Sequence, residues 1–413
     1  MTLTRRGALG LIPVGLGISP FGWFREDKPN PAQMVRDLTV APRGKRVPAA
    51  GFVITRDGML LASQHFGYAS GLSQSERASS IKRRPFDINT PFRAASISKL
   101  ATAMIAGVLH DEGTLDLDAP IAPYLSDVAL RSRKGADITM RQLLSHTAGL
   151  SDPNVYWLAH PGRIDEMMHT AFEARHTKGF EYCNFGYGIA ATVIELAAER
   201  RFDQLFSDIF NPLPMDAGFN WSGVSALQRS RGATLYRETD EGWQVQADGP
   251  DVFAADTPAI LIEDGADLST YTLGQNGTLF SPQGGLRAGL TDLALLAQLL
   301  TDAPQLTTPV WTLNASGTNG IHDKRYFTQF GTGVHIHPAE ESPWPGQTMW
   351  GHHGEAYGLY AGAWHLPDLG IAVSYAVTGT PEIPPQRSKA HPALNTVTEP
   401  LLAAARATYE NKR

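Results

Sequence analysis

The strongest chemical signal in this 413-residue chain is the stretch Phe92-Arg93-Ala94-Ala95-Ser96-Ile97-Ser98-Lys99. Apolar residues recur at helical spacing after it, and Gly113 is a natural end for the helix. The three-residue spacing places Ser96 and Lys99 on one face of this helix. A serine hydroxyl needs a base to become a nucleophile, and burial with neighbouring positive charge can lower the pKa of a lysine enough for that role. Ser96 is therefore the candidate nucleophile and Lys99 its candidate base.

The Ser-x-x-Lys spacing alone is a weak signal. Ser79 and Lys82 repeat it, but Arg83-Arg84-Pro85 follows, so no apolar helix begins there. For Ser96 the alternative is a helix-capping serine with a solvated lysine one turn later. The assignment therefore needs support from other parts of the chain.

A second element, Tyr182-Cys183-Asn184, precedes a helical pattern over residues 186–199. A phenol beside a lysine ammonium has a depressed pKa and can relay protons, so we expect Tyr182 to ionise readily. The amide of Asn184 can hydrogen-bond a substrate amide. The alternative is a buried tyrosine followed by a helix-capping asparagine. The thiol of Cys183 would lie beside the site, as a candidate target for alkylation.

The third element is Trp350-Gly351-His352-His353-Gly354-Glu355-Ala356-Tyr357-Gly358, just ahead of a C-terminal strand pair. Glycine in a strand lets a ligand or another backbone approach closely. The backbone N–H of Glu355, the residue after Gly354, would then complete an oxyanion hole with the N–H of Ser96.

Histidine pairs raise the question of a metal site. His352 and His353 are adjacent, so on a strand they point to opposite faces. His335 and His337 share a face, but the sequence places no third histidine or carboxylate beside them. We therefore expect no metal and no cofactor.

The composition, 42% hydrophobic and 18% charged, is ordinary for a globular protein. A net charge of −6 with both signs spread along the chain argues against nucleic acid as a partner. A single cysteine excludes an intrachain disulfide and a multi-cysteine zinc site. The sequence does not indicate an oligomeric state.

Residues 1–27 are predicted to be a signal segment of the twin-arginine type. Arg5 and Arg6 precede an uncharged stretch that Pro13 and Pro20 interrupt, which makes it too short and too broken for a membrane span. We expect a periplasmic or secreted protein, or a cytoplasmic one if the segment is not a signal. No stable membrane span is expected in the mature chain.

The rest of the chain is organised as strands, then helices, then strands, then a helix. The sequence predicts, in order, a hairpin at 51–66 around Asp57-Gly58, helices from 96 to about 205, loops with short elements at 214–280, strands at 359–366 and 371–377, and a helix after Thr396. The two strand regions can pair in one sheet around the helical part. This is an α+β layout.

Taken in order, Ser-x-x-Lys, Tyr-x-Asn and His-x-Gly resemble the serine β-lactamase and penicillin-binding protein superfamily. The stretches 138–150 and 281–294 agree with its class C β-lactamase-like branch, which includes D-alanyl-D-alanine carboxypeptidases, D-aminopeptidases and family VIII esterases. The resemblance covers about residues 48–405. It implies one catalytic domain, residues 28–413, with an antiparallel sheet flanked by helices and an inserted all-helical subdomain. The implied parts are a mixed α/β part at about 48–95 and 275–413, a helical part at about 96–213 and a variable region at about 214–274.

The resemblance also assigns roles to the candidate residues. Ser96 would be acylated, Lys99 and Tyr182 would act as coupled base and acid, and Asn184 would bind the substrate amide or hold Lys99. His352 takes the first place of the family's Lys-Thr-Gly motif, with Gly354 as its glycine.

The implied function is a serine acyl hydrolase acting on small peptides or esters. A histidine is only partly charged near neutral pH, which disfavours a penicillin-type carboxylate. Peptidase activity is therefore expected first, then esterase, with β-lactamase as a side activity. The alternatives are a true β-lactamase and a penicillin-binding or sensor module that acylates without turnover.

Overall fold

The computed structural model describes residues 30–40, 45–72, 83–158, 160–240, 242–248, 268–321, 326–381 and 385–412. The predicted signal segment lies outside these residues and stays a prediction. Among the helices of the described part, none combines the length and the apolar character that a membrane crossing needs.

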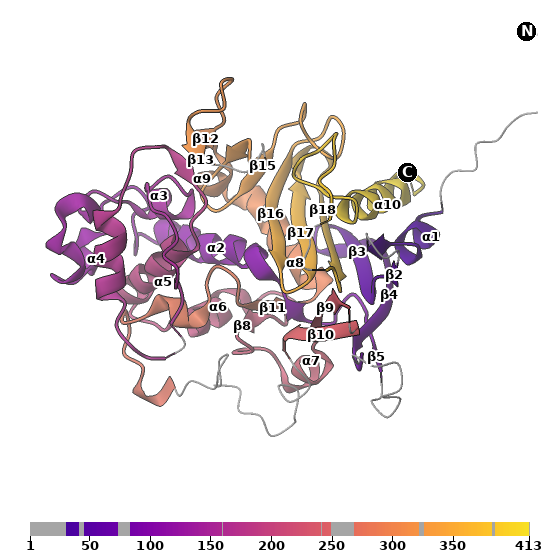
Figure 1. Cartoon of the computed structure of the whole chain (residues 1–413), viewed down its shortest axis with the longest axis horizontal. Coiled ribbons are helices and arrows are strands. Elements are labelled where there is room, and N and C mark those ends of the chain that lie inside the picture. The colour runs from indigo at the N-terminus through magenta and orange to yellow at the C-terminus, as the bar shows by residue number, and fades with distance from the viewer. Residues whose placement is uncertain are drawn as a thin grey trace, which may run out of the picture.

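A nine-stranded antiparallel sheet forms one half of the molecule (Figure 1). Its strands, in spatial order, are β12 (Trp311–Thr312), β14 (Gln329–Phe330), β15 (His335–His337), β16 (Met349–Ala356), β17 (Leu359–Leu366), β18 (Ile371–Thr378), β3 (Ala49–Arg56), β4 (Met59–Ser70) and β5 (Arg84–Pro85). The predicted N-terminal hairpin, β3–β4, pairs with the C-terminal strand β18, as the order of elements indicated. Asp57 and Gly58, which join the hairpin, both have positive φ, as the twist of a tight hairpin requires.

The two faces of the sheet carry different side chains. On β18 the large residues Ile371, Val373 and Tyr375 belong to the core under α1 (Pro31–Arg36) and α10 (Thr398–Glu410). The residues between them, such as Ala372 and Ala376, face the other core, which includes α2 (Ser98–Asp111) and α8 (Leu290–Gln298). Small residues on this face let α8 lie close to the sheet, and Ser374 Oγ donates a hydrogen bond to the Leu290 carbonyl at 2.6 Å. Because successive side chains of a strand point to opposite faces, α1 and α10 pack on one face of the sheet and α2 and α8 on the other.

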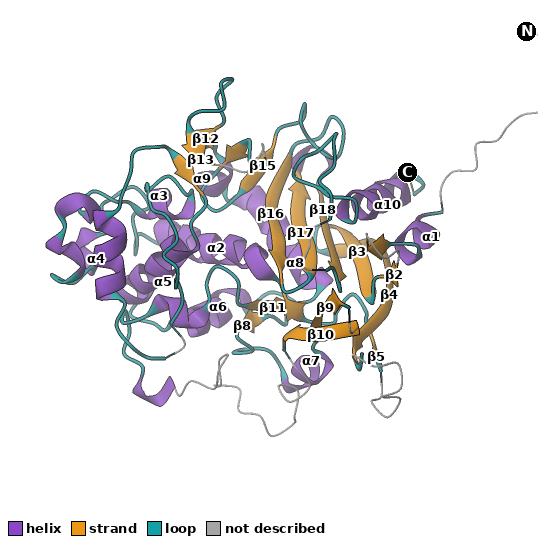
Figure 2. Cartoon of the chain, viewed as in Figure 1, coloured by secondary structure: helices purple, strands orange, loops and turns teal. Residues whose placement is uncertain are grey.

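Helices form the other half of the molecule, opposite α10 across the sheet (Figure 2). Besides α2, they are α3 (Met140–Leu144), α4 (Asp165–Glu173), α5 (Asn184–Ala198) and α6 (Phe202–Phe210). A short parallel pair, β7 (Phe180–Glu181) with β13 (Gly320–Ile321), ties this half to the chain leading into the sheet. The helical pattern expected from residue 96 to about 205 corresponds to this region.

Smaller elements complete the described fold, and several were not expected from the sequence. They are β1 (Thr39–Val40) with β2 (Lys45–Arg46), the sheet of β6 (Phe92–Arg93), β11 (Leu286–Ala288) and β8 (Gly218–Phe219), the hairpin of β9 (Leu235–Thr239) and β10 (Gly242–Ala247), and the helices α7 (Ala226–Arg231) and α9 (Pro304–Thr307). The hairpin falls where loops with short elements were expected. Next to it, Arg287 of β11 and Asp248 form a buried ion pair with N···O distances of 2.7 and 3.1 Å.

Candidate active site

Ser96 lies in a short 3-10 turn, Ala95–Ile97, between β6 and the start of α2 at Ser98. Ala95 has φ of 49°, in the left-handed region that a non-glycine residue adopts at a cost. Two hydrogen bonds of Ser98 hold the turn: its Oγ donates to the Ala95 carbonyl at 2.7 Å and accepts from the Leu286 N–H at 2.9 Å. The nucleophile candidate is thus fixed against the three-stranded sheet.

The amine of Lys99 lies in the buried interior beside Ser96. Its Nζ is 3.1 Å from Ser96 Oγ, 2.8 Å from Asn184 Oδ1 and 3.1 Å from the carbonyl of Gln283. Burial lowers the pKa of Lys99 from its usual 10.5 to about 7. A neutral amine has two N–H donors and one lone pair. The two oxygens that can only accept take both donors, which leaves the lone pair for the hydroxyl of Ser96.

Asp152 fixes the orientation of this arrangement and was missed in the sequence. Its Oδ2 accepts from Asn184 Nδ2 at 2.8 Å, and its Oδ1 accepts from the Phe185 N–H at 2.8 Å, at the start of α5. A carboxylate cannot donate, so the amide of Asn184 must turn its oxygen to Lys99. Of the two roles expected for Asn184, the geometry supports holding Lys99. The available signal was the place of Asp152, two residues after the stretch 138–150.

Tyr182 contacts Ser96, but its acidity is the reverse of the expectation. Its hydroxyl is hydrogen-bonded to Ser96, and its ring stacks on Phe327 at 5.1 Å and packs on His146 at 4.3 Å. Burial raises the pKa of Tyr182 well above its usual 10. The expected depression was wrong because removal from water, which disfavours the phenolate, outweighs the hydrogen bond with Ser96, which lowers the pKa. Tyr182 is therefore a protonated donor facing Ser96.

Strand β16 runs against the turn that carries Ser96. A Cβ built on Gly354 would lie 2.6 Å from the Ala94 carbonyl oxygen, which is closer than a methyl group can approach. The backbone of Gly354 consequently passes close to the turn that carries Ser96, and the oxyanion-hole role of the Glu355 N–H stays a prediction. Neighbouring His352 is buried, and its Nδ1 is 2.5 Å from the His353 carbonyl. Burial, with Lys99 nearby, lowers the pKa of His352 to about 3, so it is neutral rather than partly charged.

Replacing Gly354 with alanine is expected to reduce kcat/KM at least tenfold and to destabilise the fold by about 1–3 kcal/mol, since the methyl group displaces β16 from the Ser96 turn. Steady-state kinetics and urea unfolding would measure the two effects. Gly107→Ala on α2 is the control, because its Cβ would meet only side-chain atoms at 3.4 Å or more. Unchanged activity in Gly354→Ala would contradict the close approach.

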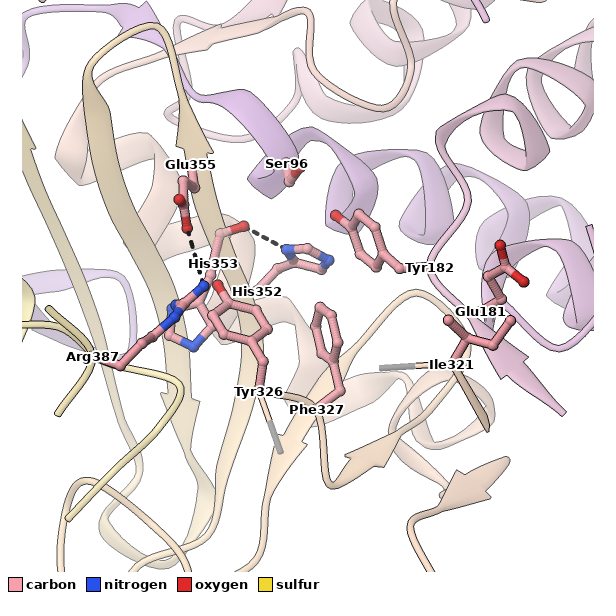
Figure 3. A pocket seen from close by; sticks show the side chains of 10 residues that line it. All are labelled: Ser96, Glu181, Tyr182, Ile321, Tyr326, Phe327, His352, His353, Glu355 and Arg387. Atoms are coloured by element: carbon pink, nitrogen blue, oxygen red, sulfur yellow. Dashed lines mark hydrogen bonds and ion pairs between the residues drawn. The ribbon is translucent and has the colours of Figure 1, made fainter. Parts of the chain in front are cut away.

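A pocket of about 460 Å³ opens over these groups (Figure 3). The residues that line it are Ser96, Glu181, Tyr182, Ile321, Tyr326, Phe327, His352, His353, Glu355 and Arg387. The hydroxyl of Tyr182 points toward Ser96, whereas Glu355 and the histidines come from β16. Arg387 lies 3.9 Å from the Glu355 carboxylate and 4.4 Å over the Tyr326 ring. Tyr326, Phe327 and Arg387 carry no motif, so the sequence offered no signal for them.

Cys183 does not behave as an exposed thiol. It is buried, and its Sγ lies 3.4 Å from Asp152 Oδ1. Burial raises the pKa of Cys183 well above its usual 9, so the expected role as an alkylation target is wrong. We expect iodoacetamide at pH 8 to leave the native protein unlabelled and to label it once in urea, as measured by intact mass. Fast labelling of the native protein would contradict the buried position.

The structure also corrects the expectation that no third histidine accompanies His335 and His337. His353 of β16 lies beside them, and their ligand nitrogens are all within 4.8 Å of one another. His352 is not in this group, in keeping with the opposite faces of adjacent strand residues. His146 has φ of 60° and accepts the Cys183 N–H at 3.0 Å through Nδ1, so it links the turn after α3 to the segment that carries Tyr182.

The chain combines an antiparallel sheet, a helical region beside it and a serine–lysine pair where the two meet. This combination is typical of one class of α+β protein. The sequence model of the β-lactamase family matches residues 35–398, and the chain belongs to that family. In a solved structure, D-amino acid amidase from Ochrobactrum anthropi SV3, the fold matches with a TM-score of 0.62 at 18% identity, over 92% of this chain and 100% of that one. The predicted α+β, β-lactamase/transpeptidase-like fold is thereby confirmed.

Curated relatives match over shorter segments. The chain is 28% identical over 197 residues to D-aminopeptidase from Cereibacter sphaeroides, covering 44% of this chain and 34% of that protein. It is 33% identical over 120 residues to esterase EstB from Burkholderia gladioli, covering 29% of this chain and 27% of the esterase. The chain thus matches about a third of the length of these relatives.

Proposed function

We propose that this protein is a serine acyl hydrolase that works through an acyl-enzyme on Ser96. The observation that carries the proposal is the buried Lys99 amine, 3.1 Å from Ser96 Oγ, with its other two contacts made to obligate acceptors. A base with a pKa near 7 is well suited to remove a proton at neutral pH.

The steps follow from the positions of the donors and acceptors. Lys99 takes the proton of Ser96 as Oγ attacks the substrate carbonyl. The N–H groups of Ser96 and Glu355 stabilise the oxyanion. Tyr182 donates its proton to the leaving amine or alcohol and regains one by way of Lys99. Water then attacks the acyl-enzyme as Lys99 takes one of its protons. The acyl–Oγ bond breaks, the acid is released, and Lys99 returns the proton to Oγ of Ser96.

The charges of the pocket favour a substrate that carries an amino group. Glu181 and Glu355 are acidic, His352 is neutral, and the cation Arg387 is already paired with Glu355. A substrate carboxylate therefore finds little positive charge. The two acidic side chains of the lining, Glu355 and Glu181, contact Arg387 and His176 respectively, so any preference for an ammonium is modest. Small peptides and amino-acid amides rank first, esters second and β-lactams third. D-aminopeptidase and D-amino acid amidase, to which the chain is similar, are named for such substrates.

Covalent labelling tests the proposed nucleophile. A fluorophosphonate should add once to the wild type by intact mass, should not add to Ser96→Ala, and should add normally to Ser79→Ala, which removes the other Ser-x-x-Lys serine. No adduct on the wild type, or an adduct that survives Ser96→Ala, would sink the proposal. A panel of D- and L-amino-acid amides with free or acetylated amino groups, esters and a chromogenic β-lactam then ranks the substrates. A single stoichiometric burst without turnover would replace the hydrolase with a sensor.

The pH profile is expected to report Lys99. Activity requires the neutral amine, so with a substrate that has no amino group kcat/KM should rise through pH about 7 and stay level toward pH 9, because Tyr182 remains protonated there. Tyr182→Phe should lower the plateau about 10²-fold or more but keep the limb near pH 7, since the limb belongs to Lys99. Loss of this limb in Tyr182→Phe would instead assign the titration to the tyrosine.

A further inference from the structure

Three buried histidines meet on one face of the sheet at its β15–β16 edge. His335 pairs with Gly351 and His337 with Met349, so His353, two residues beyond Gly351, lies on the same face as both. The face is the one opposite Ile336, which packs into the core of the α2 side. The ligand nitrogens of the three lie within 4.8 Å of one another. This juxtaposition joins residues from two strands and is independent of Ser96.

These imidazoles have nitrogens with no partner among the described residues. They are both nitrogens of His335, Nε2 of His337 and Nε2 of His353. A buried polar atom without a hydrogen bond costs about 1–3 kcal/mol. One nitrogen from each of the three rings can share a single partner, whereas the second nitrogen of His335 points to the other side of its ring. A neutral imidazole has one lone pair that a metal ion can use.

We propose that His335, His337 and His353 bind one divalent first-row transition-metal ion, of which Zn²⁺ is the best match. Three neutral imidazoles suit Zn²⁺ and similar ions, whereas Ca²⁺ and Mg²⁺ require oxygen ligands. Zn–N bonds of about 2.0–2.1 Å would bring the nitrogens to roughly 3.3 Å apart in a tetrahedral site, which small ring rotations can achieve. The fourth ligand is a water molecule, as at other three-histidine sites.

A pocket and an aromatic ring adjoin the three histidines. His337 also lines a second pocket of about 320 Å³, whose charged lining residues are Glu340, Glu341 and Lys389. The centre of the Trp364 ring, on the neighbouring strand β17, lies 4.6 Å from that of His353 and 4.9 Å from that of His337. Trp364 therefore packs against the histidine cluster.

The proposed site also adjoins the catalytic pocket. His353 and Tyr326 line the pocket over Ser96, and Glu355, whose N–H is proposed above to bind the oxyanion, is two residues from His353. A bound ion would crosslink β15 to β16 and stiffen the strand that carries this N–H. The ion is thus placed to stabilise the pocket wall without contacting the reacting atoms, and its binding does not depend on the proposed function.

Cobalt binding tests the site directly. Tag-free full-length protein, stripped with chelator, is titrated with Co²⁺ and followed by the visible absorption of four-coordinate cobalt, with Zn²⁺ as competitor. We expect one Co²⁺ per chain, displaced by one Zn²⁺, and a rise in melting temperature on loading. His335→Gln and His337→Gln should weaken binding more than about 100-fold. His65→Gln, an exposed histidine on β4, should bind as the wild type does.

Each outcome decides for or against the site. A folded wild type that takes up no stoichiometric Co²⁺ or Zn²⁺ overturns the proposal and leaves internal water as the partner of the nitrogens. Unchanged binding in His337→Gln moves the site elsewhere and also overturns it. If circular dichroism finds the variants unfolded, X-ray absorption of the Co²⁺-loaded wild type decides: three imidazole ligands support the site, and a shell without them rejects it.

Discussion

Replacing Lys99 with methionine is expected to lower kcat/KM by about 10³–10⁴-fold for the best substrate of the panel, the upper part of the range for a positioned base. Methionine fills a similar volume but has no lone pair basic enough for the proton of Ser96. The two oxygens that contact Nζ, Asn184 Oδ1 and the Gln283 carbonyl, also lose a donor. Lys134→Met, at an exposed lysine of the helical half, is the control and should retain full activity.

Stability distinguishes this catalytic role from a structural one. The pKa of Lys99 is about 7 in the folded state and 10.5 when solvated, so the unfolded chain binds more protons between these values. Wild-type stability should therefore rise from pH 7 to pH 10 on this account. Lys99→Met removes that slope and should be at least as stable as the wild type at pH 7, by urea unfolding. An inactive variant that is also strongly destabilised would instead indicate a structural lysine, and activity within tenfold of wild type would remove Lys99 from the mechanism.

Replacing Arg287 with methionine is expected to destabilise the protein by about 3–5 kcal/mol, because it leaves the Asp248 carboxylate buried without its partner. Arg287 Nη1 also donates to Asn220 Oδ1 at 3.2 Å and to the Gly285 carbonyl at 2.8 Å, and these bonds are lost as well. Since β11 pairs with β6, the strand that leads to Ser96, kcat/KM should fall too.

A double variant separates the buried charge from the lost packing. Arg287→Met with Asp248→Leu should recover part of the stability, measured by urea unfolding at equal pH. Arg131→Met at the exposed pair with Glu166 is the matched surface control and should change stability by less than about 1 kcal/mol. A loss no larger at Arg287 than at Arg131 would show that the buried pair contributes little.

The local arrangement of the catalytic residues could be predicted, but their protonation could not. Spacing alone places Ser96 beside Lys99, since three residues are one turn of helix. The acidity of Tyr182 depends on burial by Phe327 and His146, which come from other parts of the chain. Asp152 reaches Asn184 only after the chain folds back, so no spacing could have connected them.

The fold, like the site, could be predicted from the sequence only in part. The Asp57-Gly58 turn and the strand patterns near residues 359–377 predict their elements directly, because local geometry and period-two burial decide them. The position of His353 beside His335 and His337 could not be predicted, because it depends on the register of β15 against β16 across an intervening loop. The β9–β10 hairpin was missed although Trp243, Val245 and Ala247 of β10 alternate with two glutamines.

The pairing of β3 with β18 has a consequence for synthesis of the chain. Ala49 finds its partner Thr378 only when more than three hundred further residues have been made. Until then β3 of the hairpin has an unpaired edge, and the strand β16, which packs against the Ser96 turn, is missing. Contacts this distant in sequence slow folding and lengthen the time during which aggregation competes. A ribosome-bound fragment that ends before β16 thus contains Ser96 and Lys99 but lacks the strand that completes the active site.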